Sequence, residues 1–136
     1  MRVVLDTNVL VSAVLTAHGA CARIVDLVVE GELQLCADDR LLAEYERVLR
    51  RPELRIVPED AAVLLELLRA VCDPVAGHPL PVRLPDPDDA AFLEVAVASQ
   101  SVLVTGNARH FPKASRAGVT VLTPRELLDL IRASRP

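Results

Sequence analysis

Aromatic residues are scarce in this sequence: they make up 2% of its 136 residues, and tryptophan is absent. Hydrophobic residues still account for 51%, so a core must be built mainly from leucine, valine and alanine. An aliphatic core of this kind favours helices layered on a sheet. The scarcity of aromatic rings also argues against a module that binds single-stranded nucleic acid by stacking bases on aromatic side chains.

A surplus of basic residues is missing as well. The formal net charge is −4, so the chain lacks the overall positive charge that is typical of nucleic-acid-binding domains. Two interpretations remain open at this point. The protein either does not meet nucleic acid, or it has local basic patches around an acidic pocket that binds metal.

Signals for zinc, secretion and membrane insertion are also missing. Cys21, Cys36 and Cys72 are widely spaced, with no Cys-x-x-Cys or Cys/His pattern, so we expect reduced thiols rather than a zinc site. No basic start followed by an apolar run indicates a signal peptide, and no run approaches the ~20 apolar residues of a membrane span. We therefore expect a cytoplasmic protein with no membrane association, folded as a single domain over residues 1–136.

Short apolar runs alternate with segments of helical periodicity along the chain. We predict strands at residues 2–5, 33–37, 102–105 and 119–122. Residues 82–84 are a candidate for a further short strand within the proline-rich segment 73–87. We predict helices at about residues 8–15, 20–30, 39–50, 58–71, 89–99 and 124–133. The alternation predicts an α/β fold with a mostly parallel sheet and helices on both faces.

Helix starts are marked by capping residues. Asp38 or Asp39 is placed to cap the third helix, and Pro58 opens the fourth with acidic residues in its first turn. Thr123 and Glu126 form a capping-box pattern at the start of the last helix.

Three acidic positions stand where a parallel sheet would bring them together. Asp6 ends the first predicted strand, although aspartate is a poor strand residue and is costly to bury alone. Glu44 lies about a turn and a half into the helix that follows the second strand, and Asp89 lies at the start of a later helix. Because the carboxyl ends of the strands and the starts of the following helices share one edge, these residues can converge there.

A cation explains such a convergence best. Carboxylates that share a pocket raise one another's pKa, and a divalent cation removes that penalty. An all-oxygen set of ligands favours Mg²⁺ or Mn²⁺ over zinc. The pattern indicates metal-assisted hydrolysis of a phosphodiester, in which the ion activates water and offsets the negative charge that develops at phosphorus.

Each acid also has an ordinary structural explanation. Asp38, Asp39, Asp88 and Asp89 all stand where a helix cap is wanted, and capping is the commoner role for any one of them alone. Glu44 lies in a charged helix, where a glutamate is usually solvated. Asp6 is the acid that these explanations account for least.

A family resemblance adds to this reasoning. Four segments carry it, at residues 3–10, 41–52, 84–96 and 102–111. None is very specific alone, but in this order and spacing they make the chain resemble PIN-domain proteins along nearly its whole length. The pattern is similar to the branch that contains toxins of toxin–antitoxin systems, related to VapC-type toxins.

The resemblance implies a Mg²⁺- or Mn²⁺-dependent ribonuclease with a PIN-like three-layer α/β/α sandwich and a mostly parallel sheet of four or five strands. Asp6, Glu44 and Asp89 match the three motif acids and would bind metal and carry catalysis, with Asp86 as an additional metal-binding acid. The matching auxiliary polar residues are Thr7, Asn8, Thr105 and Asn107. Nearby basic residues that are candidates for contacts to RNA phosphates are Arg40, Arg47, Arg50, Arg51, Arg109, His110 and Lys113, of which we favour Arg47, Arg109 and His110.

The last motif departs from the family pattern. Many PIN domains carry a fourth acid at the position of Asn107 or three residues later, at that of His110. The pocket therefore carries less negative charge here, which bears on whether it holds a second metal ion.

Three hypotheses follow. The first is a toxin that cleaves RNA, restrained by a small cognate antitoxin that inserts an arginine or lysine into the acidic groove, and assembled as a homodimer through the helices at 20–30 and 58–72. The second is a catalytically weak PIN-fold module that binds RNA or protein, which the missing fourth acid and the charge of −4 favour. The third, a receiver-like phosphotransfer domain, is disfavoured because the late strands do not end in the lysine that it needs.

Overall fold

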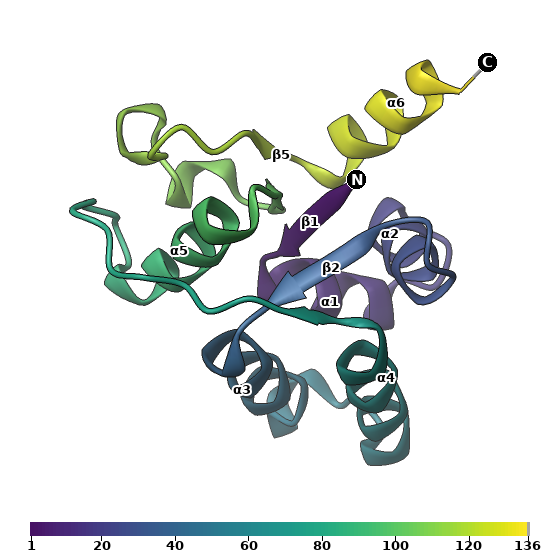
Figure 1. Cartoon of the computed structure of the whole chain (residues 1–136). Coiled ribbons are helices and arrows are strands. Elements are labelled where there is room, and N and C mark those ends of the chain that lie inside the picture. Colours follow the sequence, from purple (N-terminus) through teal and green to yellow (C-terminus); the bar gives the residue numbers. More distant parts are fainter. Residues whose placement is uncertain (136) are drawn as a thin grey trace.

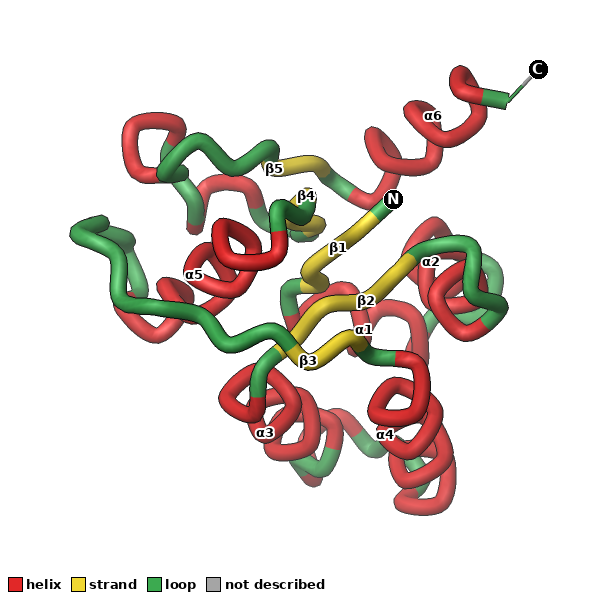
Figure 2. The backbone as a smooth tube through the Cα atoms, viewed as in Figure 1, coloured by secondary structure: helices red, strands yellow, loops and turns green. Residues whose placement is uncertain are grey.

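Five strands form one parallel sheet in the computed structural model, which describes residues 1–135. The strands are β1 (Arg2–Leu5), β2 (Gln34–Ala37), β3 (Asp73–Pro74), β4 (Val102–Val104) and β5 (Val121–Leu122). Their order across the sheet is β3-β2-β1-β4-β5, and every neighbouring pair runs parallel. Figure 2 shows the N-terminal strand β1 in the middle of this order, between β2 and β4.

Six α-helices cover the sheet. They are α1 (Thr7–Leu15), α2 (Ala20–Val29), α3 (Asp39–Leu49), α4 (Pro58–Val71), α5 (Ala90–Ser99) and α6 (Pro124–Ser134). Helix α5 packs on β1, β2 and β4 from one side, whereas α1 and α2 lie on the other side, and α3 and α4 pack together near the β2–β3 edge (Figure 1). The predicted α/β/α sandwich with a parallel sheet is thereby confirmed.

The core is aliphatic, as the composition predicts. The strands contribute fully buried residues such as Leu5, Leu35 and Leu103, and α5 contributes Leu93 on the face of the sheet that it covers. Strand β1 is buried on both faces from Val3 to Leu5, which explains why these three residues are an apolar run.

Strand boundaries differ from the predictions at the edges of the sheet. Residues 82–84 form no strand, and the fifth strand is instead β3, formed by Asp73 and Pro74. It forms because the chain there lies along β2: Val75 donates a backbone hydrogen bond of 3.0 Å to the carbonyl of Ala37, and Arg2 holds Asp73 with an ion pair of 2.7 Å. Edge pairing and this ion pair, rather than strand propensity, decide where β3 lies.

Helix starts follow the capping signals. Asp38, and not Asp39, caps α3 by accepting a hydrogen bond of 3.1 Å from the backbone of Leu41. Thr123 and Glu126 form the predicted capping box at α6, with both reciprocal hydrogen bonds present. Within residues 1–135 no single helix is long and apolar enough to cross a membrane, although the bent pair of α1 and α2, 105° apart, meets that criterion in length and composition.

Candidate active site

The sheet continues one residue beyond β1 and β4, and this extension places the first acid. The backbone N–H of Asp6 donates to the carbonyl of Val104 at 2.9 Å, and that of Thr105 donates to Leu122 at 3.0 Å. The two residues therefore stand side by side where their strands end. The Thr105 hydroxyl donates a buried hydrogen bond of 2.8 Å to Oδ2 of Asp6.

Further hydrogen bonds fix the Asp6 carboxylate. The Asn8 side-chain amide lies 3.4 Å from the same Oδ2 atom, and its own Oδ1 accepts from the backbone of Gly106 at 3.0 Å. The backbone N–H of Asn107 donates to the Thr105 hydroxyl at 3.0 Å. The predicted auxiliary residues Asn8, Thr105 and Asn107 thus form one network that orients Asp6.

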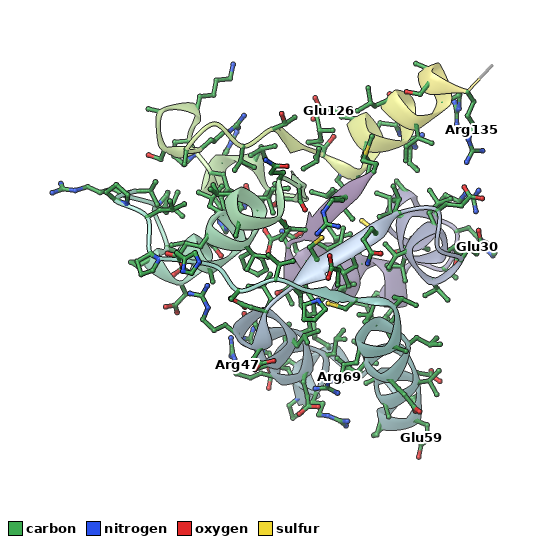
Figure 3. The ribbon with its side chains drawn as sticks, viewed as in Figure 1. Glu30, Arg47, Glu59, Arg69, Glu126 and Arg135 are labelled. Carbon is green, nitrogen blue, oxygen red and sulfur yellow. The ribbon has the colours of Figure 1, made fainter. Side chains whose placement is uncertain are left out.

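A buried tyrosine brings α3 to the same edge. The Tyr45 hydroxyl donates a hydrogen bond of 2.6 Å to the carbonyl of Leu5, the residue before Asp6. Burial raises the pKa of Tyr45, so the group stays a neutral donor. Its neighbour in sequence, Glu44, reaches the solvent side and accepts a hydrogen bond of 2.7 Å from Arg47, which Figure 3 labels on the outside of the molecule.

Asp89 is the last residue of the 3₁₀ turn Pro87–Asp89 and the N-cap residue of helix α5. Its carboxylate is 14% exposed, and its Oδ2 atom is buried without a hydrogen-bond partner among the described residues. The His110 Nδ1 atom approaches it at 3.4 Å, without the geometry of a hydrogen bond. Asp86, by contrast, is engaged, because it accepts a hydrogen bond of 3.0 Å from the backbone of Asp88.

Capping does not explain the buried Asp6 and the half-buried Asp89. Asp6 and Asp89 both occupy N-cap positions, of α1 and α5, yet neither side chain caps its helix with a hydrogen bond. Asp38 and Asp86 do accept backbone N–H groups in that way. A burial cost that capping does not offset calls for another partner for Asp6 and Asp89.

These acids open onto one cavity of about 440 Å³. Among the residues singled out from the sequence, those that line it are Asp6, Thr7, Asn8, Glu44, Arg51, Asp86, Asp89 and His110. Thr105 and Asn107 do not line the cavity; Thr105 contacts Asp6, and Asn107 contacts Thr105. Arg47 pairs with Glu44, and Arg109 is not part of the lining.

Sequence reasoning missed part of the cavity wall. Ser12 and Val11 line it from α1, and Val48 and Leu54 line it from α3 and the turn that follows. The helical spacing of positions 8, 11 and 12 carried the signal, because residues three and four apart share one face of a helix.

The cavity is strongly anionic and partly desolvated. Burial, together with the charges of Asp6 and Asp86, raises the pKa of Asp89 to about 6, although His110 acts in the opposite direction. Burial also raises the pKa of Asp6, and the hydrogen bond from Thr105 partly offsets that effect. The charge of Asp6 therefore makes the ionised state of Asp89 more costly.

A divalent cation fits this set of groups. The atoms that these acids offer to a metal are all oxygens. The buried Oδ2 atom of Asp89 and the buried hydroxyl of Thr7 have no hydrogen-bond partner within residues 1–135. In the same part of the chain, no three His, Cys, Asp or Glu side chains are gathered closely enough to enclose an ion, and Glu44 is paired with Arg47. An open arrangement of this kind suits Mg²⁺ or Mn²⁺, which bind through few carboxylates and keep several waters.

The chain is similar to a known protein family, to a curated protein and to a solved structure. The sequence profile of the family described as PIN domain matches residues 2–109. An uncharacterized protein of Methanocaldococcus jannaschii is 25% identical over 143 residues, which cover 95% of this chain and 90% of that protein. The solved structure of VapBC2 from Rickettsia felis, bound to a DNA fragment from their promoter, superposes with a TM-score of 0.62 at 16% identity, over 90% of this chain and 98% of that one. At that identity the superposition shows a shared fold.

Proposed function

Because this chain belongs to the PIN domain family, whose members are generally nucleases, we propose that it is a metal-dependent endoribonuclease that acts as the toxin of a toxin–antitoxin pair. The observation that carries the proposal is the pair of desolvated carboxylates, Asp6 and Asp89. They stand at helix starts without capping them, and they open into one cavity with Glu44.

Each residue of the site has a role in this proposal. Asp6, Glu44 and Asp89 would hold Mg²⁺ or Mn²⁺, with Asp86 in support, and the bound ion would orient the scissile phosphate and offset the charge of the transition state. Thr105 and Asn8 keep the Asp6 carboxylate aimed into the cavity.

Positive groups at the rim would receive the RNA backbone. Arg51 and His110 line the cavity, and Arg47 stands beside it on α3. Arg47 also forms an ion pair of 2.7 Å with Glu44, which would exchange this partner for the metal ion. An arginine suits this position because its planar guanidinium can bind either a carboxylate or a phosphate.

Partners follow from the charge of the cavity and from the outer face of α4. An antitoxin that inserts an arginine or lysine among the acids would occupy the cation site, and the antitoxin complex of the Rickettsia felis structure supports such a partner. Helix α2 buries its apolar face in the core, but α4 leaves Val63 58% and Leu67 40% exposed, which supports a homodimer through α4.

Cys21, Cys36 and Cys72 are free thiols, which supports action in the cytoplasm.

A catalytically weak binding module is the second candidate. The observation that favours it is the last motif, where Asn107 reaches the site only through its backbone N–H and His110 takes the place of an acid. The two candidates differ in a single measurable property, which is metal-dependent cleavage.

The test is cleavage of a mixed-sequence RNA panel with Mg²⁺, Mn²⁺ or EDTA. We expect the wild type to cut RNA only when Mg²⁺ or Mn²⁺ is present. Asp6→Asn and Asp89→Asn should stay folded but cut at least about a hundredfold more slowly. Asp39→Asn is the matched control, because Asp39 is an exposed acid outside the cavity. Titration of Mn²⁺ by calorimetry completes the test: binding without cleavage of any RNA would favour the binding module over the nuclease.

A further inference from the structure

A second cavity, of about 330 Å³, adjoins the acidic one. Glu44 lines both cavities, and the turn Pro87–Asp89 separates them, with Asp88 facing one and Asp89 facing the other. An RNA strand whose phosphate lay among the acids would therefore bring a neighbouring nucleotide to this second cavity. We propose that the second cavity is a subsite for a nucleobase that carries an exocyclic amino group; this rests on the proposed action on RNA.

The lining of the second cavity suits a flat ring. Ala91 of α5 and Pro87 supply apolar surface to the cavity, and the buried Leu41 and Phe92 reach its lining only with small exposed parts. Apolar walls recognise the faces of a base, and proteins that bind single-stranded RNA hold splayed bases in this way.

Its charges exclude a phosphate and favour a hydrogen-bond donor. Arg40 is the one cation of the lining, against Glu44, Asp88 and Glu94. Arg40 is already committed, because it donates to Glu94 at 2.7 Å and to Asp38 at 2.8 and 2.9 Å. A second phosphate would be repelled by the uncompensated carboxylate of Asp88, whereas the neutral base of a nucleotide would not be.

Asp88 is the carboxylate that is free to accept. It is exposed, and its side chain makes no hydrogen bond or ion pair within residues 1–135, whereas Glu94 is held by Arg40 and Glu44 by Arg47. Carboxylates accept from the amino group of cytosine, and adenine also offers an amino donor. Uracil presents a carbonyl oxygen at the equivalent position, so the subsite discriminates against it.

Arg40 also gives the subsite a fixed shape. Its guanidinium joins the start of α3 to the buried Glu94 of α5, and Gly77 of the intervening loop packs against both residues. A planar cation held on two sides presents its remaining N–H groups and its face in one orientation, which is a condition for selective recognition.

The test uses free nucleosides, which carry no phosphate and need no metal. Amide chemical shifts of the full chain in EDTA are followed during titration with cytidine or uridine, which differ at C4, where cytidine has an amino group and uridine a carbonyl, and at the adjoining N3. We expect cytidine to shift the amides around Asp88 and Ala91, with an affinity about tenfold higher than that of uridine. Equal affinities, or shifts elsewhere, overturn the subsite.

Two variants sharpen the result. Ala91→Leu fills the cavity and should abolish the cytidine shifts, whereas Ala98→Leu, seven residues further along α5 and exposed outside the cavity, should leave them unchanged. Asp88→Asn offers both a donor and an acceptor, so it should remove the preference for cytidine without loss of folding. An Ala91→Leu chain that binds cytidine like the wild type refutes the subsite.

The outcomes separate this inference from the proposed function. A chain that cuts RNA but binds no nucleoside keeps the nuclease and overturns the subsite. A chain that binds cytidine in this cavity but cuts no RNA keeps the subsite and overturns the nuclease.

Discussion

The Oγ1 atom of Thr105 and the Oδ2 atom of Asp6 are joined by a hydrogen bond of 2.8 Å, although 99 positions separate the two residues in the sequence. The bond is buried, and it lowers the pKa of an acid that burial raises. Thr105, at the end of the neighbouring strand β4, therefore makes the Asp6 carboxyl easier to ionise.

Replacement of Thr105 by valine should weaken metal binding. Without the hydroxyl, Asp6 Oδ2 retains the longer contact of 3.4 Å to Asn8, and its carboxylate becomes harder to ionise. We expect the affinity for Mn²⁺ to fall about tenfold, as is usual when the partner of a ligand is lost. Calorimetry at neutral pH measures this, and Thr105→Ser, which keeps the hydroxyl, should bind like the wild type. Equal binding by the serine and valine variants would contradict the role of the bond.

Replacement of Asp89 by asparagine should stabilise the metal-free chain at neutral pH. The folded pKa of about 6 lies above the ordinary value of 3.8, so the folded state holds the proton more tightly than the unfolded state does. The stability that this proton confers is present below about pH 4 and is lost as the pH rises to about 6. Urea unfolding in EDTA near pH 7.5 should show a gain of about 1–2 kcal/mol for Asp89→Asn. The exposed neighbour provides the control: Asp88→Asn should change stability by less than about 0.5 kcal/mol.

The affinity for metal should rise with pH, whereas the contribution of Asp89 to the stability of the metal-free chain falls with pH. A cation needs Asp89 and Asp6 ionised, and the pKa values of both are raised, that of Asp89 to about 6. We expect the affinity for Mn²⁺ to rise from about pH 5 to about pH 7 and then to level off. Titrations at several pH values, with proton release followed in two buffers, measure the effect. A flat profile would mean that neither acid is a ligand.

Loss of the Tyr45 hydroxyl should cost stability. Tyr45→Phe keeps the packed ring but removes the hydrogen bond of 2.6 Å to the carbonyl of Leu5. We expect the free energy of unfolding to fall by about 1–2 kcal/mol, because a buried polar group loses its partner. Tyr45→Leu, which also leaves a cavity, should cost about 3 kcal/mol or more. Urea unfolding of the two variants separates the bond from the packing, and a phenylalanine variant as stable as the wild type would count against the bond.

A methyl group at Gly77 should disturb the loop between β3 and α5. A Cβ atom there would lie 2.8 Å from the Arg40 guanidinium and 3.0 Å from the backbone of Glu94. The arginine can move but the helix backbone cannot, so Gly77→Ala should cost about 1–3 kcal/mol. At Gly106 the nearest atom would be 3.4 Å away, an ordinary contact, so Gly106→Ala should be tolerated. Thermal unfolding of both variants tests the difference.

The helices and the central strands were within reach of the sequence because each carries its own local signal. The capping box of Thr123 and Glu126 and the apolar run of β1 are examples. Strand β3 was not within reach: Asp73 and Pro74 are poor strand residues, and they pair only because Arg2 and β2 hold them in place. An edge strand of two residues is decided by tertiary contacts, which a local pattern does not contain.

The same division applies to the candidate site. The convergence of Asp6, Glu44 and Asp89 on one cavity follows from the rule that parallel strands end at one edge. The contact of Arg40 with Glu94 does not follow from it, because these residues are 54 positions apart and meet through side chains. For Arg47 the signal was present but was interpreted differently: a spacing of three from Glu44 in a helix favours the ion pair that forms.

The central place of β1 has a consequence for synthesis of the protein. Strand β1 leaves the ribosome before both of its neighbours in the sheet, and one of them, β4, begins at Val102. Until that segment has emerged, Asp6 has neither the backbone acceptor of Val104 nor the hydroxyl of Thr105. The acidic cavity also includes His110, so it cannot be assembled on a growing chain until the segment that carries His110 has emerged.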